Sequence, residues 1–305
     1  MSLLQLIYLL PLIGLWVFAG LDEPLTMIAI ATTLFLAIKT HSLLIYQERR
    51  RQHGQDFQFD FASCLGWYTV WWGLKPSEFF ERHPTGPIER SELVFAGLKC
   101  VVGVLLLTLV VPSVLNHSGQ SAGREIVGGW LGMVGIVFCM HFGYSHITAV
   151  VLRARGRLVA PIMNRPVVAS SVSEFWGKRW NLAFRDYAHV TLFMPLARKW
   201  GAAIGAIAGF VFSGVIHELA ISLPARGGYG WPMLYFLIQG LGVLGERRFA
   251  KWGWWKPGSV ASRCWAIAVV ALPVPLLFHQ AFVTKVIVPI VHNRHDHLRY
   301  KRLMK

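Results

Sequence analysis

The sequence is poor in charge, and the charges it has are mostly of one sign. Only 15% of its 305 residues are charged, against about 25% in an average soluble domain. Acidic residues are especially scarce, since 15 Asp and Glu stand against 30 Lys and Arg, while 54% of the chain is hydrophobic. This composition excludes an ordinary soluble globular domain. Because the basic residues gather between apolar stretches, we expect anionic membrane lipids and phosphate-bearing small molecules as partners, and no nucleic acid.

Cysteine and linker sequence are scarce as well. The four cysteines occur singly, with neither a CxxC pair nor a metal-binding spacing, and we interpret them as apolar packing residues. No internal repeat, low-complexity tract or Gly/Ser-rich linker divides the chain. We therefore predict one integral-membrane domain over residues 1–305, with no metal and no bound cofactor.

Apolar runs recur along the chain and are long enough to cross a hydrocarbon core, which takes about 20 residues as a helix. The predicted spans lie near residues 3–19, 26–46, 93–112, 126–152, 202–223, 229–245 and 264–291. The first run has no basic leader and no small-residue cleavage site, so we expect a span there and not a removable signal peptide. Since backbone groups in lipid must be satisfied internally, the spans should be helices. The predicted fold class is all-α, a polytopic transmembrane helix bundle of about seven or eight spans.

The basic residues between the spans predict the orientation. Three connections are rich in Lys and Arg, with 6, 9 and 5 of them at residues 47–92, 153–200 and 246–263. The connections at 20–25, 113–125 and 224–230 hold only 0, 1 and 1. By the positive-inside rule the first three are cytoplasmic. We expect a multi-pass integral membrane protein, located in the cell membrane if the source is bacterial.

The C-terminal tail conflicts with this count. Five more basic residues follow position 292, on the side that a strict seven-span count places outside. Prolines at 273, 275 and 289 are compatible with a break in the last span. The aromatic stretches at 61–74 and 184–195 are compatible with segments that dip into the membrane or lie at its interface. The sequence leaves these alternatives open.

An ionisable pair lies inside one predicted span. His217 and Glu218 are adjacent within the otherwise apolar run 202–223. Ionisable groups inside a membrane are costly, and they usually face a protein interior or a wet cavity that serves function. Ser213 lies one helical turn before His217 and shares its face. Gly214 also flanks His217 on its face, and the small residues Gly201, Gly205 and Gly209 let another helix approach closely. We predict that His217 faces inward; the alternative is a histidine that only hydrogen-bonds a neighbouring helix.

A tryptophan-rich motif lies upstream of this span, in the long basic connection. It reads Phe175-Trp176-Gly177-Lys178-Arg179-Trp180-Asn181. Paired tryptophans around two cations are typical of a membrane interface, which is the simplest interpretation of the motif taken alone. Asn181 adds an amide that donates and accepts hydrogen bonds at once.

Together the two motifs resemble the membrane-bound O-acyltransferase superfamily, and most closely its wax-synthase-like branch. The resemblance rests on the tryptophan motif and on Ser-Gly-x-x-His-Glu some 35 residues later, within a motif-bearing core of about 170–250. It implies a helix bundle with a tunnel in which an acyl thioester from the cytoplasm meets a hydroxyl that arrives from lipid. It also implies that His217 is the catalytic histidine and Asn181 its partner. The substrate contacts we predict are Phe175, Trp176, Arg179, Trp180, Glu218, Ser213 and His141.

The chemistry of acyl transfer is consistent with these residues. An alcohol attacks a thioester slowly, and a positioned base that removes its proton contributes about 10²- to 10⁴-fold. Neutral imidazole at His217 suits that task, while Asn181 would stabilise the developing oxyanion or orient the acyl carbonyl. No Ser or Cys nucleophile motif is evident, which favours direct transfer. We predict a membrane-embedded O-acyltransferase that moves a fatty acyl group from acyl-CoA, as co-substrate, or another acyl thioester to a lipid-like alcohol.

Other functions remain open at this level. A transporter or channel would use His217 and Glu218 as a buried proton relay. A diiron oxidase or desaturase would need histidine clusters; His141 and His146 form one H-x4-H pair, yet no two histidines are adjacent. A b-type haem held between helices is a further possibility. The zinc-protease motif HExxH is incomplete because Ile221 occupies the place of its second histidine.

Overall fold

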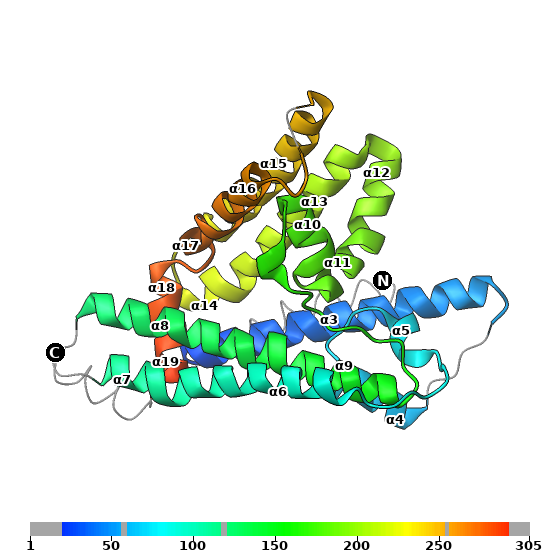
Figure 1. Cartoon of the computed structure of the whole chain (residues 1–305), viewed down its shortest axis with the longest axis horizontal. Helices are drawn as coiled ribbons and strands as arrows, with labels where there is room; N and C mark the ends of the chain where they lie inside the picture. Colours follow the sequence, from blue (N-terminus) through cyan, green and yellow to red (C-terminus); the bar gives the residue numbers. More distant parts are fainter. Residues whose placement is uncertain (1–19, 56–59, 117–120, 254–255, 293–305) are drawn as a thin grey trace.

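The protein is built from helices throughout the part that the structure describes. The computed structural model describes residues 20–55, 60–116, 121–253 and 256–292, and these contain no strand. Figure 1 shows two groups of helices, one formed by residues 23–154 and the other by residues 172–277, with a C-terminal segment that crosses the long helices of the first group. The predicted all-α class is confirmed.

The first group consists of long helices joined by short elements. Its elements are α3 (Glu23–Gln52), α4 (Phe61–Thr69), α5 (Pro76–Phe80), α6 (Arg90–Leu105), the π-helical turn η1 (Leu106–Val110), α7 (Val111–Leu115), α8 (Ala122–Val137), the π-helical turn η2 (Phe138–Tyr144) and α9 (Ser145–Ala154). The α3 helix begins at Asp22, whose carboxylate accepts a hydrogen bond from the Leu25 N–H at 3.0 Å, a standard N-cap. Glycine lets α6 and η2 touch, since a Cβ on Gly103 would lie 2.6 Å from the Cys139 nitrogen.

The second group holds the tryptophan motif and the histidine span. Its elements are the 3₁₀ turn η3 (Pro166–Val168), α10 (Val172–Glu174), the π turn η4 (Phe175–Arg179), α11 (Leu182–Ala188), the π turn η5 (His189–Phe193), α12 (Met194–Trp200), α13 (Ala202–His217), the π turn η6 (Glu218–Ser222), α14 (Leu223–Ala225), α15 (Trp231–Lys251), α16 (Val260–Ala271) and α17 (Val274–Leu277). The α13 and α15 helices pack closely because Gly214 lies against Met233, where a Cβ would come within 2.6 Å of the sulfur.

The C-terminal segment connects the two groups. It consists of α18 (Gln280–Phe282), the π turn η7 (Val283–Ile287) and α19 (Val288–Val291). Val283 is fully buried and packs against Gly129 of α8, where a Cβ would lie 2.5 Å from the valine. Close contact at a glycine gives dispersion energy that a larger side chain would forbid.

Five helical segments are long and apolar enough to cross a membrane. They are Glu23–Gln52, Arg90–Leu115, Ala122–Ala154, Ala202–Ala225 and Val260–Leu277. The spans predicted at 26–46, 93–112, 126–152 and 202–223 match the first four. The chain is thus a multi-pass integral membrane protein, as predicted.

The three other predicted spans have different outcomes. The run at 3–19 lies outside the described residues, as does the tail after residue 292. The run at 229–245 is helical, as α15. It is not one of the five segments named above, because its polar residues make it less apolar. The last predicted span, 264–291, is broken in two near Phe278, into Val260–Leu277 and the shorter helix Gln280–Val291. Of the aromatic stretches, 61–74 forms α4 and an irregular turn, and 184–195 belongs to the continuous helical run from α11 to α12.

The three basic connections meet on one side of the protein. The N–H of His83 donates to the carbonyl of Gly156 at 3.0 Å, which joins the connection 47–92 to the connection 153–200. Glu246 accepts from the backbone N–H groups of Val172 at 2.6 Å and Ser173 at 2.9 Å, which brings in the third connection. This clustering agrees with the single cytoplasmic side that the positive-inside rule predicts for them.

Candidate active site

His217 is the last residue of α13, and the geometry of its ring is fixed by its own helix. Its Nδ1 lies 2.7 Å from the carbonyl oxygen of Ser213. A carbonyl only accepts, so Nδ1 carries the proton and Nε2 carries the lone pair. The ring packs against Phe236 of α15, with 4.5 Å between centroids. No residue of the described ranges hydrogen-bonds Nε2, and His217 lines an internal cavity.

Glu218 directly follows His217 in the sequence, but its side chain contacts a different part of the protein. Its Oε1 accepts from the backbone N–H of Gly230 at 2.9 Å and of Met233 at 3.1 Å. These N–H groups belong to the first turn of α15, where a carboxylate satisfies unpaired donors and the helix dipole. Glu218 does not line the cavity. The structure therefore separates the two residues that a proton relay would join.

The tryptophan motif ends at Asn181, which has an unusual backbone. With φ 40° and ψ 60°, it occupies the left-handed region, which asparagine tolerates better than most residues. From there its Oδ1 accepts from the N–H of Phe184 at 3.3 Å and caps α11. Its Nδ2 has no hydrogen-bond acceptor in the part of the chain described. Asn181 thus offers the cavity a donor, which suits an acyl carbonyl or oxyanion.

The aromatic residues of the motif form one wall of the cavity. Phe175 and Trp180 stack with 5.5 Å between centroids and 15° between planes. Trp176 meets Phe210 of α13 edge-on at 5.9 Å and Phe236 of α15 at 5.8 Å. Such ring contacts stabilise the wall, and they join η4 to α13, which carries His217, and to α15.

These elements enclose a cavity of about 780 Å³ between α10–α13 and α15–α17. Six predicted site residues line it: Phe175, Trp176, Trp180, Asn181, Ser213 and His217. The rest of its lining is mostly apolar, drawn from Phe184, Phe193, Phe210, Ile216, Phe236, Val243, Val270, Val274, Leu277 and Phe278. A cavity of this size with few polar groups is typical of a site for an apolar small molecule. The Ser213 hydroxyl is turned to its own helix and donates to Gly209 at 3.0 Å.

Arg179 is not among the residues that line the cavity. Its Nε donates to the carboxylate of Glu174 at 2.8 Å, and its Nη1 donates to the carbonyls of Asn164 at 3.3 Å and Arg165 at 3.4 Å. Hydrogen bonds from Ser170 and the ion pair with Arg179 lower the pKa of Glu174 to about 2. Arg179 therefore fastens the motif to the preceding loop.

His141 is also away from the cavity lining. It lies in η2, edge-on to Trp72 at 5.5 Å, and its Nδ1 is buried without a partner among the described residues. His146 belongs to a separate network, because its two ring nitrogens lie 2.9 Å from Glu92 and from Lys99. Across the described residues, no three His, Cys, Asp or Glu side chains are grouped to hold a metal.

Three basic residues on the cavity were not predicted as site residues: Arg185, His189 and Arg247. Arg247 is exposed and has no ion-pair partner in the described part of the chain, whereas Arg185 contacts Asp186 at 2.9 Å. Arg185 and His189 lie in the basic connection 153–200, and Arg247 lies just after the apolar run 229–245, positions that by themselves are typical of a membrane interface. Tertiary packing of α11, η5 and α15 brings them to the cavity.

The fold and this cavity define a polytopic helical membrane protein with a histidine and an asparagine on the wall of an internal, largely apolar site. Residues 159–238 match the membrane bound O-acyl transferase family. The match covers both motifs and confirms the resemblance that they carry.

Named relatives place the resemblance in the wax-synthase-like branch. A long-chain-alcohol O-fatty-acyltransferase of Simmondsia chinensis is 30% identical over 124 residues, which are 36% of this chain and 35% of the relative. An acyl-CoA–sterol O-acyltransferase 1 of Arabidopsis thaliana is 30% identical over 146 residues, 44% of this chain and 42% of the relative. A probable long-chain-alcohol O-fatty-acyltransferase 7 of the same plant is 28% identical over 168 residues, 48% and 50% of the two chains. The chain thus spans a third to a half of the length of these relatives.

Proposed function

We propose that this protein is a membrane-embedded O-acyltransferase that moves a fatty acyl group from an acyl thioester, with acyl-CoA as the expected donor, to the hydroxyl of a lipid-like alcohol. One observation carries the proposal. His217 and Asn181 both line one largely apolar cavity, and neither Nε2 of His217 nor Nδ2 of Asn181 has a protein partner among the described residues. The names of the relatives support the same class of reaction.

The reaction follows from these two groups. Nε2 of His217 accepts the proton of the alcohol as its oxygen attacks the carbonyl carbon of the thioester. Nδ2 of Asn181 donates to the carbonyl oxygen as negative charge develops there. The tetrahedral intermediate collapses, the C–S bond breaks and the thiolate leaves with the proton that His217 holds. The products are an ester and a free thiol, and His217 returns to its neutral state.

The cavity lining suits two hydrocarbon chains better than two polar substrates. Burial of apolar chains against the aromatic wall stabilises binding by roughly 25 cal/mol per Å² of apolar surface. Arg247 and Arg185 supply positive charge on the same cavity. We propose that they bind the phosphates of the donor, as guanidinium groups commonly do. A wax ester is the product that the relatives' names favour.

The proposal is tested with purified protein in lipid. Wild type and His217→Ala are incubated with radiolabelled long-chain acyl-CoA and a panel of fatty alcohols, sterols and diacylglycerols, and both free CoA and labelled ester are quantified. Val215→Ala is the matched control, because Val215 lies on the same helix, faces outward with 43% of its surface exposed and is not on the cavity. We expect ester from wild type and Val215→Ala and a loss of about 10²- to 10⁴-fold in His217→Ala.

The result also separates the alternatives. Wild type that consumes no thioester with any acceptor would overturn the acyltransferase proposal and favour a transporter. An active protein whose rate does not depend on His217 would retain the class of reaction but remove the base assigned here. A visible absorption spectrum of the same preparation tests for haem.

A further inference from the structure

The α16–α17 region contains a break that leaves two backbone carbonyls without a donor from their own helix. Pro273 has no N–H, so it cannot donate to the carbonyl of Val269 four residues earlier, as a helix would require. The helix restarts only at Val274, and the carbonyl of Val270 also lies at the break. A buried carbonyl without a donor costs about 1 to 3 kcal/mol. Another element has to supply the donors.

Two buried side chains of α15 supply them. Gln239 donates from Nε2 to the Val269 carbonyl at 2.7 Å, and Tyr235 donates from its hydroxyl to the Val270 carbonyl at 3.3 Å. Gln239 is completely buried, with 0% of its surface exposed. A glutamine buried at this depth in an apolar helix needs partners for both ends of its amide.

The other end of Gln239 binds the tryptophan motif. Its Oε1 accepts from the indole N–H of Trp176 at 3.1 Å. Trp176 lines the cavity and contacts Phe236, the residue that packs on His217. One carboxamide therefore joins the aromatic wall of the cavity to the break in the C-terminal span.

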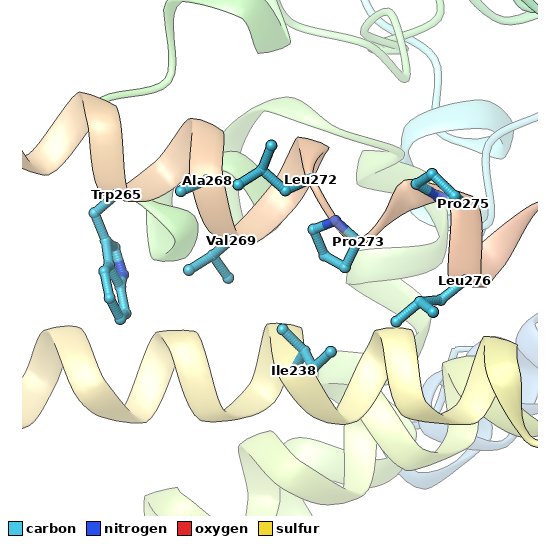
Figure 2. A pocket seen from close by; sticks show the side chains of 8 residues that line it. All are labelled: Ile238, Trp265, Ala268, Val269, Leu272, Pro273, Pro275 and Leu276. Carbon is cyan, nitrogen blue, oxygen red and sulfur yellow. The ribbon is translucent and has the colours of Figure 1, made fainter.

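Residues at the break between α16 and α17 separate the catalytic cavity from a second, outer recess. Val270, Ala271 and Val274 line the catalytic cavity. Val269 and Pro273 line an outer recess of about 500 Å³ between α15 and α16–α17, together with Ile238, Trp265, Ala268, Leu272, Pro275 and Leu276. Figure 2 shows Ile238 on one side of this recess and the prolines of the break on the other. A displacement of the break would therefore change the depth of the catalytic cavity directly.

We propose that Gln239 is a positioning residue that determines the length of hydrocarbon chain the cavity accepts. This inference rests on the proposed acyltransferase function. By holding the Trp176 indole at one end and the Val269 carbonyl at the other, Gln239 fixes the distance between two walls of the cavity. The neutral amide satisfies both partners, because one is a donor and the other an acceptor, whereas a hydrocarbon side chain or a carboxylate would not. Gln239 makes no contact with the reacting atoms and acts through Trp176 and the break.

The test compares chain-length selectivity across three variants. Gln239→Leu removes both hydrogen bonds at nearly constant volume. Trp176→Phe removes the indole N–H and leaves the bond to Val269. Gln280→Leu is the matched control, since it makes the same chemical change at an exposed position outside the cavity. The measured quantities are kcat/KM and equilibrium binding for acyl-CoA donors and for alcohols of increasing chain length.

We expect the ratio of long-chain to short-chain kcat/KM to change about tenfold or more in Gln239→Leu and in Trp176→Phe. The double variant should show less than the sum of the two effects, because the two residues act through one hydrogen bond. Gln280→Leu should keep the wild-type ratio. A purely structural role for Gln239 predicts a lower Tm with an unchanged ratio, and that result would overturn the inference.

Two further outcomes are distinguishable. If Gln239→Leu fails to fold, Trp176→Phe decides, because an unchanged chain-length profile in that variant also overturns the inference. If wild type transfers no acyl group, the proposed function fails and the mechanism assigned to Gln239 fails with it. An active wild type with unaltered selectivity in both variants refutes only the role of Gln239.

Discussion

The imidazole of His217 donates from Nδ1 to the carbonyl of Ser213, one turn earlier on the same helix, at 2.7 Å. In many histidine bases a carboxylate fixes the tautomer; here the backbone does so. The acceptor cannot be removed by changing a side chain, and it stays in place as long as α13 is helical. This relationship leads to a first prediction about Ser213 itself.

Ser213→Ala should retain most of the activity. The substitution keeps the carbonyl that holds His217 and removes only a hydroxyl that donates to Gly209. We expect kcat for ester formation to fall by no more than a few fold, since a helix-internal hydroxyl of this kind stabilises little. Steady-state kinetics of the purified variant measure the effect. A hundredfold loss would mean that the hydroxyl contacts a substrate, as we predicted from sequence.

Asn181 allows its two amide atoms to be tested separately. Asn181→Asp keeps an oxygen to cap α11 but loses the Nδ2 donor, so kcat should fall about 10²- to 10³-fold while the Tm stays near that of wild type. Asn181→Gly accepts the left-handed backbone and loses both atoms, so the same fall should come with slightly lower stability. Single-turnover kinetics and thermal unfolding are measured together. Full activity in Asn181→Asp would show that the reaction does not need the Nδ2 donor.

Glu218→Gln distinguishes the enzyme from a proton relay. Glutamine retains an oxygen that can accept from Gly230 and Met233, so α15 stays capped. Because Glu218 lies off the cavity, we expect ester synthesis within a few fold of wild type and a modestly lower Tm from loss of the charge–dipole interaction. Flux of protons in proteoliposomes is measured beside ester formation. Proton flux in wild type that this variant abolishes would support the relay instead.

A substitution at Gly209 tests whether hydrocarbon occupies this part of the cavity. Gly209 lines the cavity, and a Cβ at this position would meet no atom within 4 Å. Gly209→Leu should therefore place a side chain in open space without strain, and shift the preference toward shorter acyl chains or alcohols, about tenfold in kcat/KM. Gly97→Leu is the control, because Gly97 lies in α6 with equally open surroundings and away from the cavity. An unaltered chain profile would show that hydrocarbon does not occupy this part of the site.

Glu174 predicts a dependence of stability on pH. Its pKa falls from 4.5 to about 2 in the folded protein because Ser170 and Arg179 hydrogen-bond the carboxylate. A lowered carboxyl pKa stabilises the fold fully above the unfolded value near 4.5, and that contribution disappears as the pH falls toward 2. We expect Glu174→Gln to have a lower Tm than wild type at neutral pH, with a difference that shrinks below pH 4.5. Thermal unfolding in detergent across this range tests it, and a difference independent of pH would contradict it.

The sequence predicted those site features that depend on local pattern. A histidine inside an apolar span, and an asparagine after a tryptophan motif, are visible as residue types in unusual places, and both line the cavity. Phe175 and Trp176 follow because they lie together in η4, and Trp180 follows because it comes directly after this turn. Four of the long spans were also predictable, because hydropathy over about 20 residues is a strong signal.

The sequence did not predict contacts that depend on how distant elements pack. Glu218 was expected at the substrate because it adjoins His217, yet the helix turns it toward the start of α15. The expectation that Gly201, Gly205 and Gly209 all permit close helix packing holds only for Gly205, where a Cβ would lie 2.8 Å from the Phe193 carbonyl. Gly209 opens the cavity instead, and Gly201 forms the turn between α12 and α13 with φ +93°.

Gln239 is recognisable in the sequence as a polar residue within an apolar run, but composition alone does not identify its partners. A glutamine in an apolar helix has to be satisfied, but its partners, Trp176 and Val269, are 63 and 30 residues away. Only the folded chain shows that a proline break and a tryptophan motif require the same amide. The break between α16 and α17 has the same origin, because Pro273 removes the donor that would have continued the helix.

The helix that carries His217 continues directly into the π turn η6, Glu218–Ser222. Such a turn accommodates one residue more than an α-helix of the same rise. The orientation of the residues after η6 relative to His217 therefore depends on the number of residues in the turn as well as on their type. Deleting one residue such as Ala220 would rotate everything beyond it by about 100°, whereas replacing Ala220 by another small residue would not. At this point of the chain, insertions and deletions should be tolerated far less than substitutions.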